Sequence, residues 1–141
     1  MKTIIIIGAG AAGIMAALQA AENGADKVIL LERNEKIGRK LMITGKGRCN
    51  ITNTAELETF IKNIPGNGKF LYSAFKNFFN NDAIDFFEKI GVVTKIERGG
   101  RVFPQSDKAA DVVNGLKNAL YDHKVDLRLN AKAAKIIVED G

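Results

Sequence analysis

The chain has 141 residues, of which 46% are hydrophobic, with one cysteine and a formal net charge of +5. This is the length of one domain with enough apolar residues for a core, while a single cysteine excludes an internal disulfide and no apolar run is long enough to span a bilayer. Because the opening MKTIIII leads into Gly8 rather than into a signal-peptide cleavage site, we expect a cytoplasmic protein with no membrane partner.

The first predicted elements are a strand, a helix and a second strand. Residues 3–7 form a β-branched run that is too short for a helix. Residues 11–23 are rich in alanine with apolar residues at helical spacing, and Gly24 stands where a left-handed C-terminal cap belongs. Residues 27–31 (KVILL) are typical of a strand buried on both faces of a parallel sheet. Together they predict a βαβ unit with a right-handed crossover.

A glycine motif joins the first strand to the helix. Gly8, Gly10 and Gly13 follow the G-x-G-x-x-G pattern in the strand-to-helix context that makes it credible. The first glycine permits a tight turn, the second lets the backbone approach a pyrophosphate, and the third lets the helix pack closely on the strand. The phosphates would lie on free N–H groups, including those of Ala11 and Ala12, at the positive end of the helix.

Glu32 stands at the end of the second predicted strand, nineteen residues after Gly13. There its carboxylate is placed to accept hydrogen bonds from an adenosine ribose, and it would repel a 2′-phosphate. This favours FAD or NAD over NADP, and the motif alone does not separate the first two.

The middle of the chain is predicted to be helical. Thr54 can cap a helix that Pro65 ends, and Asp82 opens a helix that Gly91 ends. The three apolar stripes at helical spacing cover residues 54–64, 70–79 and 82–90.

The remaining elements are a hairpin, a helix and two strands. IERGGRVF at 96–103 has two short runs about a Gly-Gly pair, which is a hairpin signal. A helix begins at residues 106–107, and strands are predicted at 125–129 and 132–138. The turn GGRVFPQS can be a structural hairpin or one wall of a ligand site, and the sequence leaves both open.

Positive charge gathers in one part of the chain rather than along its whole length. A local cluster suits a small phosphate-bearing ligand better than a nucleic-acid duplex, so we expect no nucleic-acid partner. Its members are Arg33, Lys36, Arg39, Lys40, Lys46 and Arg48.

The segment GRKLMITGKGRCNITN at 38–53 carries most of this cluster. It matches throughout the pattern G-[KR]-K-[LI]-x-[IV]-[ST]-G-x-G-R-C-N-[VI]-T-N, and after the glycine motif it resembles the signature of a family of bacterial flavoproteins. These are NAD(P)/FAD-dependent oxidoreductases with a glutathione-reductase-like FAD domain, including bile-acid 4,6-reductase-like enzymes and aminoacetone oxidases. GGRVFPQSDKAADVV at 99–113 resembles the second signature of the family, and the similarity spans the entire chain.

The resemblance implies a set of FAD contacts. The adenosine-diphosphate half would be held by the glycine motif, Glu32 and Arg33, with Arg39 and Lys40 near the phosphates, and a backbone position near Ala133 would bind adenine. A loop along a flavin needs glycines for close approach and side-chain donors for the ring oxygens. The residues implied to reach toward the isoalloxazine lie in the segment 43–50 and are Ile43, Gly45, Gly47, Arg48, Cys49 and Asn50.

Cys49 has no partner cysteine, so we interpret it as a small residue packed beside the cofactor rather than as half of a dithiol relay. No residue of the segment is a convincing acid or base, and we predict neither a catalytic residue nor a metal site. In flavoenzymes of this kind the cofactor carries the hydride and the protein supplies position and electrostatics.

We therefore predict an α/β fold: a Rossmann-like parallel sheet with helices on both faces, incomplete at its C-terminal side. Residues 1–141 would be the N-terminal part of one FAD-binding domain. Its parts would be a βαβ fingerprint (1–37), a flavin-facing loop (38–53), a helical region with a hairpin (54–124), and a third parallel strand with the start of a small sheet (125–141). Because family members are much longer, we expect a fragment that is inactive alone, whose open sheet edge is available for self-association or for the rest of the parent chain.

The expected parent protein is an FAD-dependent oxidoreductase that passes a hydride from NAD(P)H through FAD to a small organic acceptor, such as a conjugated enone. Two alternatives stay open. One is an NAD-dependent dehydrogenase domain, and the other is a non-catalytic nucleotide-binding module related to tRNA-modifying flavoproteins.

Overall fold

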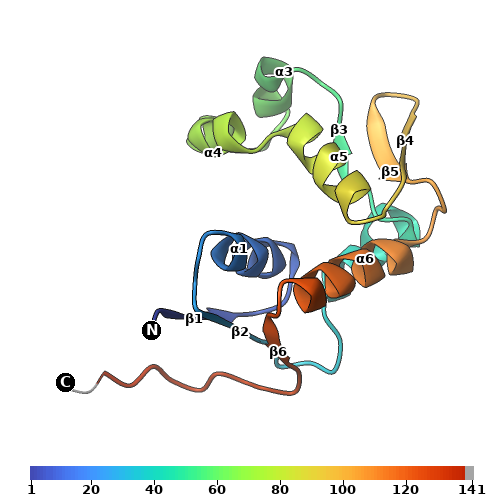
Figure 1. Ribbon diagram of the computed structural model, residues 1–141. Helices are drawn as coiled ribbons and strands as arrows, with labels where there is room; N and C mark the ends of the chain where they lie inside the picture. Colours follow the sequence, from blue (N-terminus) through green and yellow to red (C-terminus); the bar gives the residue numbers. More distant parts are fainter. Residues whose placement is uncertain (139–141) are drawn as a thin grey trace. The chain divides into compact units, whose positions relative to one another are not determined.

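The computed structural model describes residues 1–138 (Figure 1). The chain forms two compact units, one made of Met1–Met42 and Val113–Gly141 and the other of Ile43–Val112. None of the helices in the described residues has the length and the hydropathy that a membrane crossing requires.

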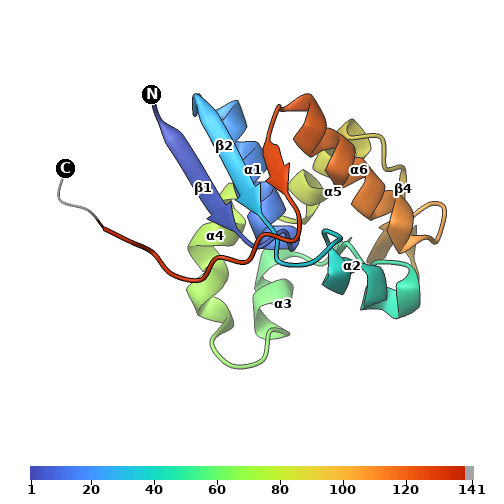
Figure 2. The same cartoon turned by 90° about the horizontal axis from the view of Figure 1, so that it is seen from below.

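The first unit contains a parallel sheet of three strands, β1 (Thr3–Ile7), β2 (Lys27–Leu31) and β6 (Asp126–Arg128), in the order β1-β2-β6 (Figure 2). Helix α1 (Ala11–Glu22) connects the first two strands and covers them with its apolar side, where Ile14, Ala17 and Leu18 are buried. The predicted βαβ unit and the third parallel strand are therefore confirmed.

The edge strand β1 is less buried than the central strand β2. In the central strand β2, Val28, Ile29 and Leu30 are buried, as the apolar run predicted. In the edge strand β1, alternate residues face solvent, and Ile5 and Ile7 are each 59% exposed. Helix α6 (Ala109–Asp122) precedes β6 and buries Val112, Leu116 and Leu120, which are spaced by four; the helix predicted from residues 106–107 thus begins at Ala109.

The chain after β6 differs from the prediction. Asn130 N donates to Asn34 O at 3.0 Å and Ala131 N to Glu32 O at 2.8 Å, so pairing with the segment after β2 continues for a few residues. Residues 132–138 form no strand, and Ile136 is 84% exposed. The predicted strand there was wrong for this structure, because a strand forms only beside a neighbour that completes its ladder of hydrogen bonds. The rest of the predicted small sheet, residues 139–141, lies outside the described residues.

The second unit contains an antiparallel sheet of β3 (Thr52–Asn53), β5 (Arg101–Pro104) and β4 (Thr94–Glu97), in the order β3-β5-β4. The predicted hairpin is confirmed as β4 and β5. It turns at Gly99 and Gly100, whose φ values of 79° and 72° lie in the left-handed region that glycine enters without strain.

The helices of the second unit are short: α3 (Leu57–Lys62), the 3₁₀ turn η2 (Gly68–Leu71), α4 (Tyr72–Asn77) and α5 (Asn80–Lys89). The helical content was predicted, but α3 begins after Glu56 and not at Thr54. The reason is tertiary, because Thr54 N donates to Gly100 O at 2.8 Å and this bond keeps residue 54 on the hairpin.

The segment 38–53 is more ordered than its pattern predicted. It forms α2 (Arg39–Ile43), the 3₁₀ turn η1 (Thr44–Gly47) and then β3. Left-handed backbone occurs within η1, at Gly45, Lys46 and Gly47, and again at Cys49 before β3. Such alternation hides the regular spacing of apolar residues on which prediction depends.

Candidate dinucleotide-binding site

The glycine motif lies in the first unit between β1 and α1. Gly8 has a φ of +99°, which disfavours any other residue, and its N–H donates to Leu31 O at 2.7 Å. A Cβ atom at Gly13 would lie 1.8 Å from the carbonyl oxygen of Gly8. The turn therefore requires glycine at the first position, and the packing of α1 on β1 requires it at the third.

Gly10 is different, because nothing in the protein requires a glycine there. Its φ of −84° and ψ of −176° are extended backbone that any residue adopts. A Cβ atom at this position would meet no other atom within 4 Å. The space that a side chain would fill is the one that the motif assigns to a pyrophosphate, so the loop fits a dinucleotide.

The first turn of α1 offers hydrogen-bond donors to that space. The first hydrogen bond of the helix runs from Ile14 N to Gly10 O at 3.0 Å, and the preceding residues Ala11 and Ala12 are exposed. The helix has neither a side-chain cap nor an acidic residue in its first turn. Its N–H groups and its positive dipole end are thus available to an anion.

Glu32 anchors the same loop from the end of β2. Its Oε2 accepts from Ala9 N at 2.8 Å, and its Oε1 accepts from Asn34 N at 2.9 Å and from the Asn34 side-chain amide. Burial raises the pKa of this carboxyl, but the N–H groups of Asn34 and Ala9 outweigh it, so that the pKa is lowered and the group is ionised. Since a carboxylate has about four acceptor sites, about one remains for a ribose hydroxyl.

The predicted basic contacts of the first unit are exposed. Arg33, Arg39 and Lys40 all lie at the surface, and Arg39 Nη1 donates to Asn34 Oδ1 at 2.8 Å. Asn34 thus links the strand-end acid to a cation, and our sequence reasoning missed it. The signal was an asparagine two residues after the acid, since short amide side chains bond nearby backbone. Ala133 is exposed in the unpaired segment.

Arg48, in the second unit, takes part in an ion-pair network. Its Nη1 lies 2.8 Å from Glu97 Oε1 and 3.1 Å from Asp107 Oδ1, and its guanidinium lies 3.9 Å from the centre of the Phe103 ring. The hydrogen bond between Arg48 and Glu97 raises the pKa of Arg48 and lowers the pKa of Glu97. Lys95 also pairs with Asp107. We had expected Arg48 as a cofactor donor, and these partners already occupy part of its donor capacity.

The other predicted flavin contacts lie in the same turn as Arg48. A Cβ atom at Gly45 would lie 2.9 Å from Asn50 N, so the packing of the loop itself requires this glycine. Cys49 is 2% exposed, and burial raises the pKa of its thiol. Ile43, Gly47 and Asn50 are exposed.

The parallel sheet, the glycine loop and the strand-end glutamate define a Rossmann-type dinucleotide-binding fold. Comparison with known proteins agrees with this class. The sequence model of the HI0933-like protein Rossmann domain family matches residues 2–141. The chain belongs to this family of FAD-binding Rossmann domains, and the predicted recognition is confirmed.

Two curated relatives illustrate the similarity. The chain is 40% identical over 129 residues to the 3-dehydro-bile acid delta(4,6)-reductase of Clostridium scindens, which covers 90% of this chain and 31% of that protein. It is 32% identical over 137 residues to the ribosomal RNA dihydrouridine synthase of Escherichia coli, which covers 96% of this chain and 33% of that protein. The chain thus spans about a third of the length of the curated relatives it matches.

Among solved structures, THI4 of Thermovibrio ammonificans superposes with a TM-score of 0.55 over 91% of this chain and 37% of that one. The sequence identity is 13%, so this similarity concerns the fold alone.

Proposed function

We propose that residues 1–141 are the FAD-binding part of a flavin-dependent oxidoreductase. The observation that carries this proposal is Gly10, whose backbone and surroundings would accept a side chain but whose open space suits a pyrophosphate. Family membership supports FAD as the dinucleotide.

The chain's own groups have distinct roles in this proposal. The N–H groups of Ala11 and Ala12 bind the pyrophosphate, because they lack acceptors at the positive end of α1. Gly8 and Gly13 shape the turn. The ionised Glu32 carboxylate accepts from a ribose hydroxyl while it holds the loop through Ala9.

Other contacts extend the proposal beyond the loop. Arg33, Arg39 and Lys40 supply positive charge near the phosphates, and the backbone near Ala133 contacts adenine. Residues 43–50 form the flavin-facing turn, held in shape by Arg48. When bound, the flavin would accept a hydride and pass it on, and these residues position it.

The names of the relatives support a proposal for the substrate class. A delta(4,6)-reductase and a dihydrouridine synthase each add hydrogen across a carbon–carbon double bond. We infer that the parent protein reduces such a bond next to a carbonyl group, with NAD(P)H as the source of the hydride.

The test is an FAD titration of the 141-residue chain, followed by the flavin absorption band that remains after gel filtration. Gly10→Val should abolish retention, because the added side chain occupies the space of the pyrophosphate. Ala16→Val, on an exposed position of the same helix, is the matched control and should retain FAD. Equal binding by both variants, or no binding by the unaltered chain, would contradict the proposal.

A further inference from the structure

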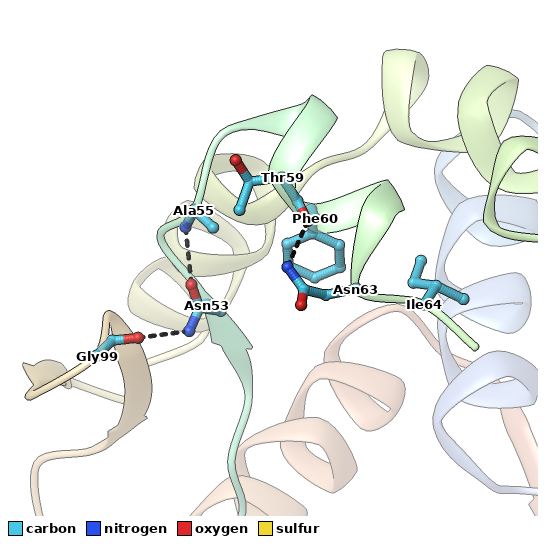
Figure 3. Close-up of a pocket in the computed structure, with 7 residues that line it drawn as sticks. All are labelled: Asn53, Ala55, Thr59, Phe60, Asn63, Ile64 and Gly99. Carbon is cyan, nitrogen blue, oxygen red and sulfur yellow. Dashed lines mark hydrogen bonds between the residues drawn. The ribbon is translucent and has the colours of Figure 1, made fainter.

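A pocket of about 430 Å³ lies entirely within the second unit, between the end of β3, the hairpin turn and α3 (Figure 3). Its size lies at the lower end of the range for small-molecule sites, which suits a single ring with a substituent. Its lining residues are Asn53, Ala55, Thr59, Phe60, Asn63, Ile64 and Gly99.

None of these seven residues carries a charge. Ala55, Phe60 and Ile64 supply an apolar lining, and the polar groups are amides, a hydroxyl and backbone. Because the lining holds no ionised side chain, phosphates, carboxylates and ammonium ions would find no ion-pair partner there. It favours an uncharged ligand.

The wall beside β3 is held in one conformation. The side chain of Asn53 donates to Gly99 O and accepts from Ala55 N, each at 2.8 Å, as Figure 3 shows. Behind it, Asn80 is 6% exposed and donates to Asn53 O and to Ala55 O, both at 2.8 Å. Such a wall is pre-organised, so a ligand would lose little binding energy in ordering it.

The opposite side offers both an aromatic face and polar groups. Phe60 packs against Phe75 and Phe79, with ring centroids 5.3 and 5.2 Å apart, and this cluster fixes its ring beside the pocket. Asn63 donates one amide hydrogen to Thr59 O at 2.8 Å, which leaves the second hydrogen and the amide oxygen for a ligand. The hydroxyl of Thr59 is a third polar group.

We propose that this pocket binds an uncharged ring molecule bearing one carbonyl or amide group. The ring lies against Phe60 and Ile64, and its polar substituent bonds the amide of Asn63. The seven lining residues lie outside the turn at 43–50 that is proposed to face the flavin, so this proposal does not depend on FAD binding.

The test uses three probes that share a benzene ring and differ in charge: benzamide, benzoate and benzylamine. They are titrated into the ¹⁵N-labelled chain and followed by two-dimensional NMR. Benzamide should shift the signals of Gly99, Thr59 and the Asn63 side chain with a Kd of about 1 mM, a weak affinity typical of a single ring. The charged probes should bind at least fivefold more weakly at these residues.

Two variants of lining residues and one control variant test whether binding occurs in this pocket. Thr59→Trp fills the pocket and should abolish the benzamide shifts, whereas Lys62→Trp, on the same helix but outside the lining, should leave them unchanged. Asn63→Leu keeps the shape without the amide and should weaken binding about fivefold. Equal binding of all three probes, or benzamide binding that survives Thr59→Trp in a folded chain, would overturn the proposal.

Discussion

Gly10→Asp should make the chain more stable and at the same time abolish FAD binding. The φ and ψ values of Gly10 suit an N-cap residue, no atom lies within 4 Å of the new Cβ, and the first turn of α1 contains no acid. An aspartate there can therefore accept hydrogen bonds from free N–H groups of the helix and complement its dipole.

The size of the two effects can be worked out from this geometry. Capping adds a few tenths of a kcal/mol over glycine, the dipole about 0.5 kcal/mol and the loss of glycine flexibility a similar amount, so stability should rise by about 1 kcal/mol. For a chain of this length the melting temperature would rise by about 3 °C. The new carboxylate would repel a pyrophosphate about 5 Å away by about 3 kcal/mol at an effective dielectric constant of about 20. This loss of binding free energy corresponds to a Kd for FAD that is at least ~100-fold higher.

The assay combines thermal unfolding without flavin and an FAD titration on the same preparation. Gly10→Asn is the matched control for stability, because it caps the helix without adding a charge; it should also lose FAD, because its side chain fills the same space. A melting temperature several degrees below that of the unaltered chain would refute the geometry of the cap. Undiminished FAD binding would refute the position of the pyrophosphate.

Three further changes test the other contacts. Gly13→Ala should lower the free energy of unfolding by at least about 2 kcal/mol, because the new atom overlaps backbone; an unchanged midpoint in urea would contradict this. Glu32→Gln should lower the free energy of unfolding by about 1–3 kcal/mol at neutral pH, because it turns an amide donor toward the N–H of Ala9 or of Asn34. Because the native pKa of Glu32 is lowered, the stabilisation that its carboxylate provides is present above the unfolded-state pKa and is lost as the pH falls through the native value. The variant has no such carboxylate, so its free energy of unfolding should decrease less on acidification. Arg48→Met should raise the pKa of Glu97 measured by carboxyl ¹³C NMR, and an unchanged value would show that the ion pair does not persist in solution.

The parts of the fold that could be predicted from sequence are those whose signal is local. The strand, glycine turn and helix at 3–23 each carry their own spacing, and the Gly-Gly pair marks the hairpin turn. The glycine motif also placed the candidate site, since the same few residues form the turn and line the open space.

The rest depends on contacts between residues far apart in the chain. The start of α3 is set by a hydrogen bond from Thr54 to Gly100, and the partners of Arg48 lie 49 and 59 residues away. The spacing of apolar residues along the sequence indicates neither of these contacts. The run at 132–138 has strand-like composition, but its state depends on a neighbouring strand that composition does not reveal.

The most direct test is a titration of the ¹⁵N-labelled chain with ADP, with riboflavin as the comparison ligand. ADP contains the adenosine and the pyrophosphate of FAD that are assigned to the glycine loop, whereas riboflavin contains neither. We predict that ADP shifts the backbone signals of Gly8, Gly10, Ala11 and Ala12 in a saturable way and that riboflavin leaves them in place. Saturating ADP without shifts in this loop, or equal shifts with riboflavin, would contradict the assignment of the loop to the adenosine diphosphate of FAD.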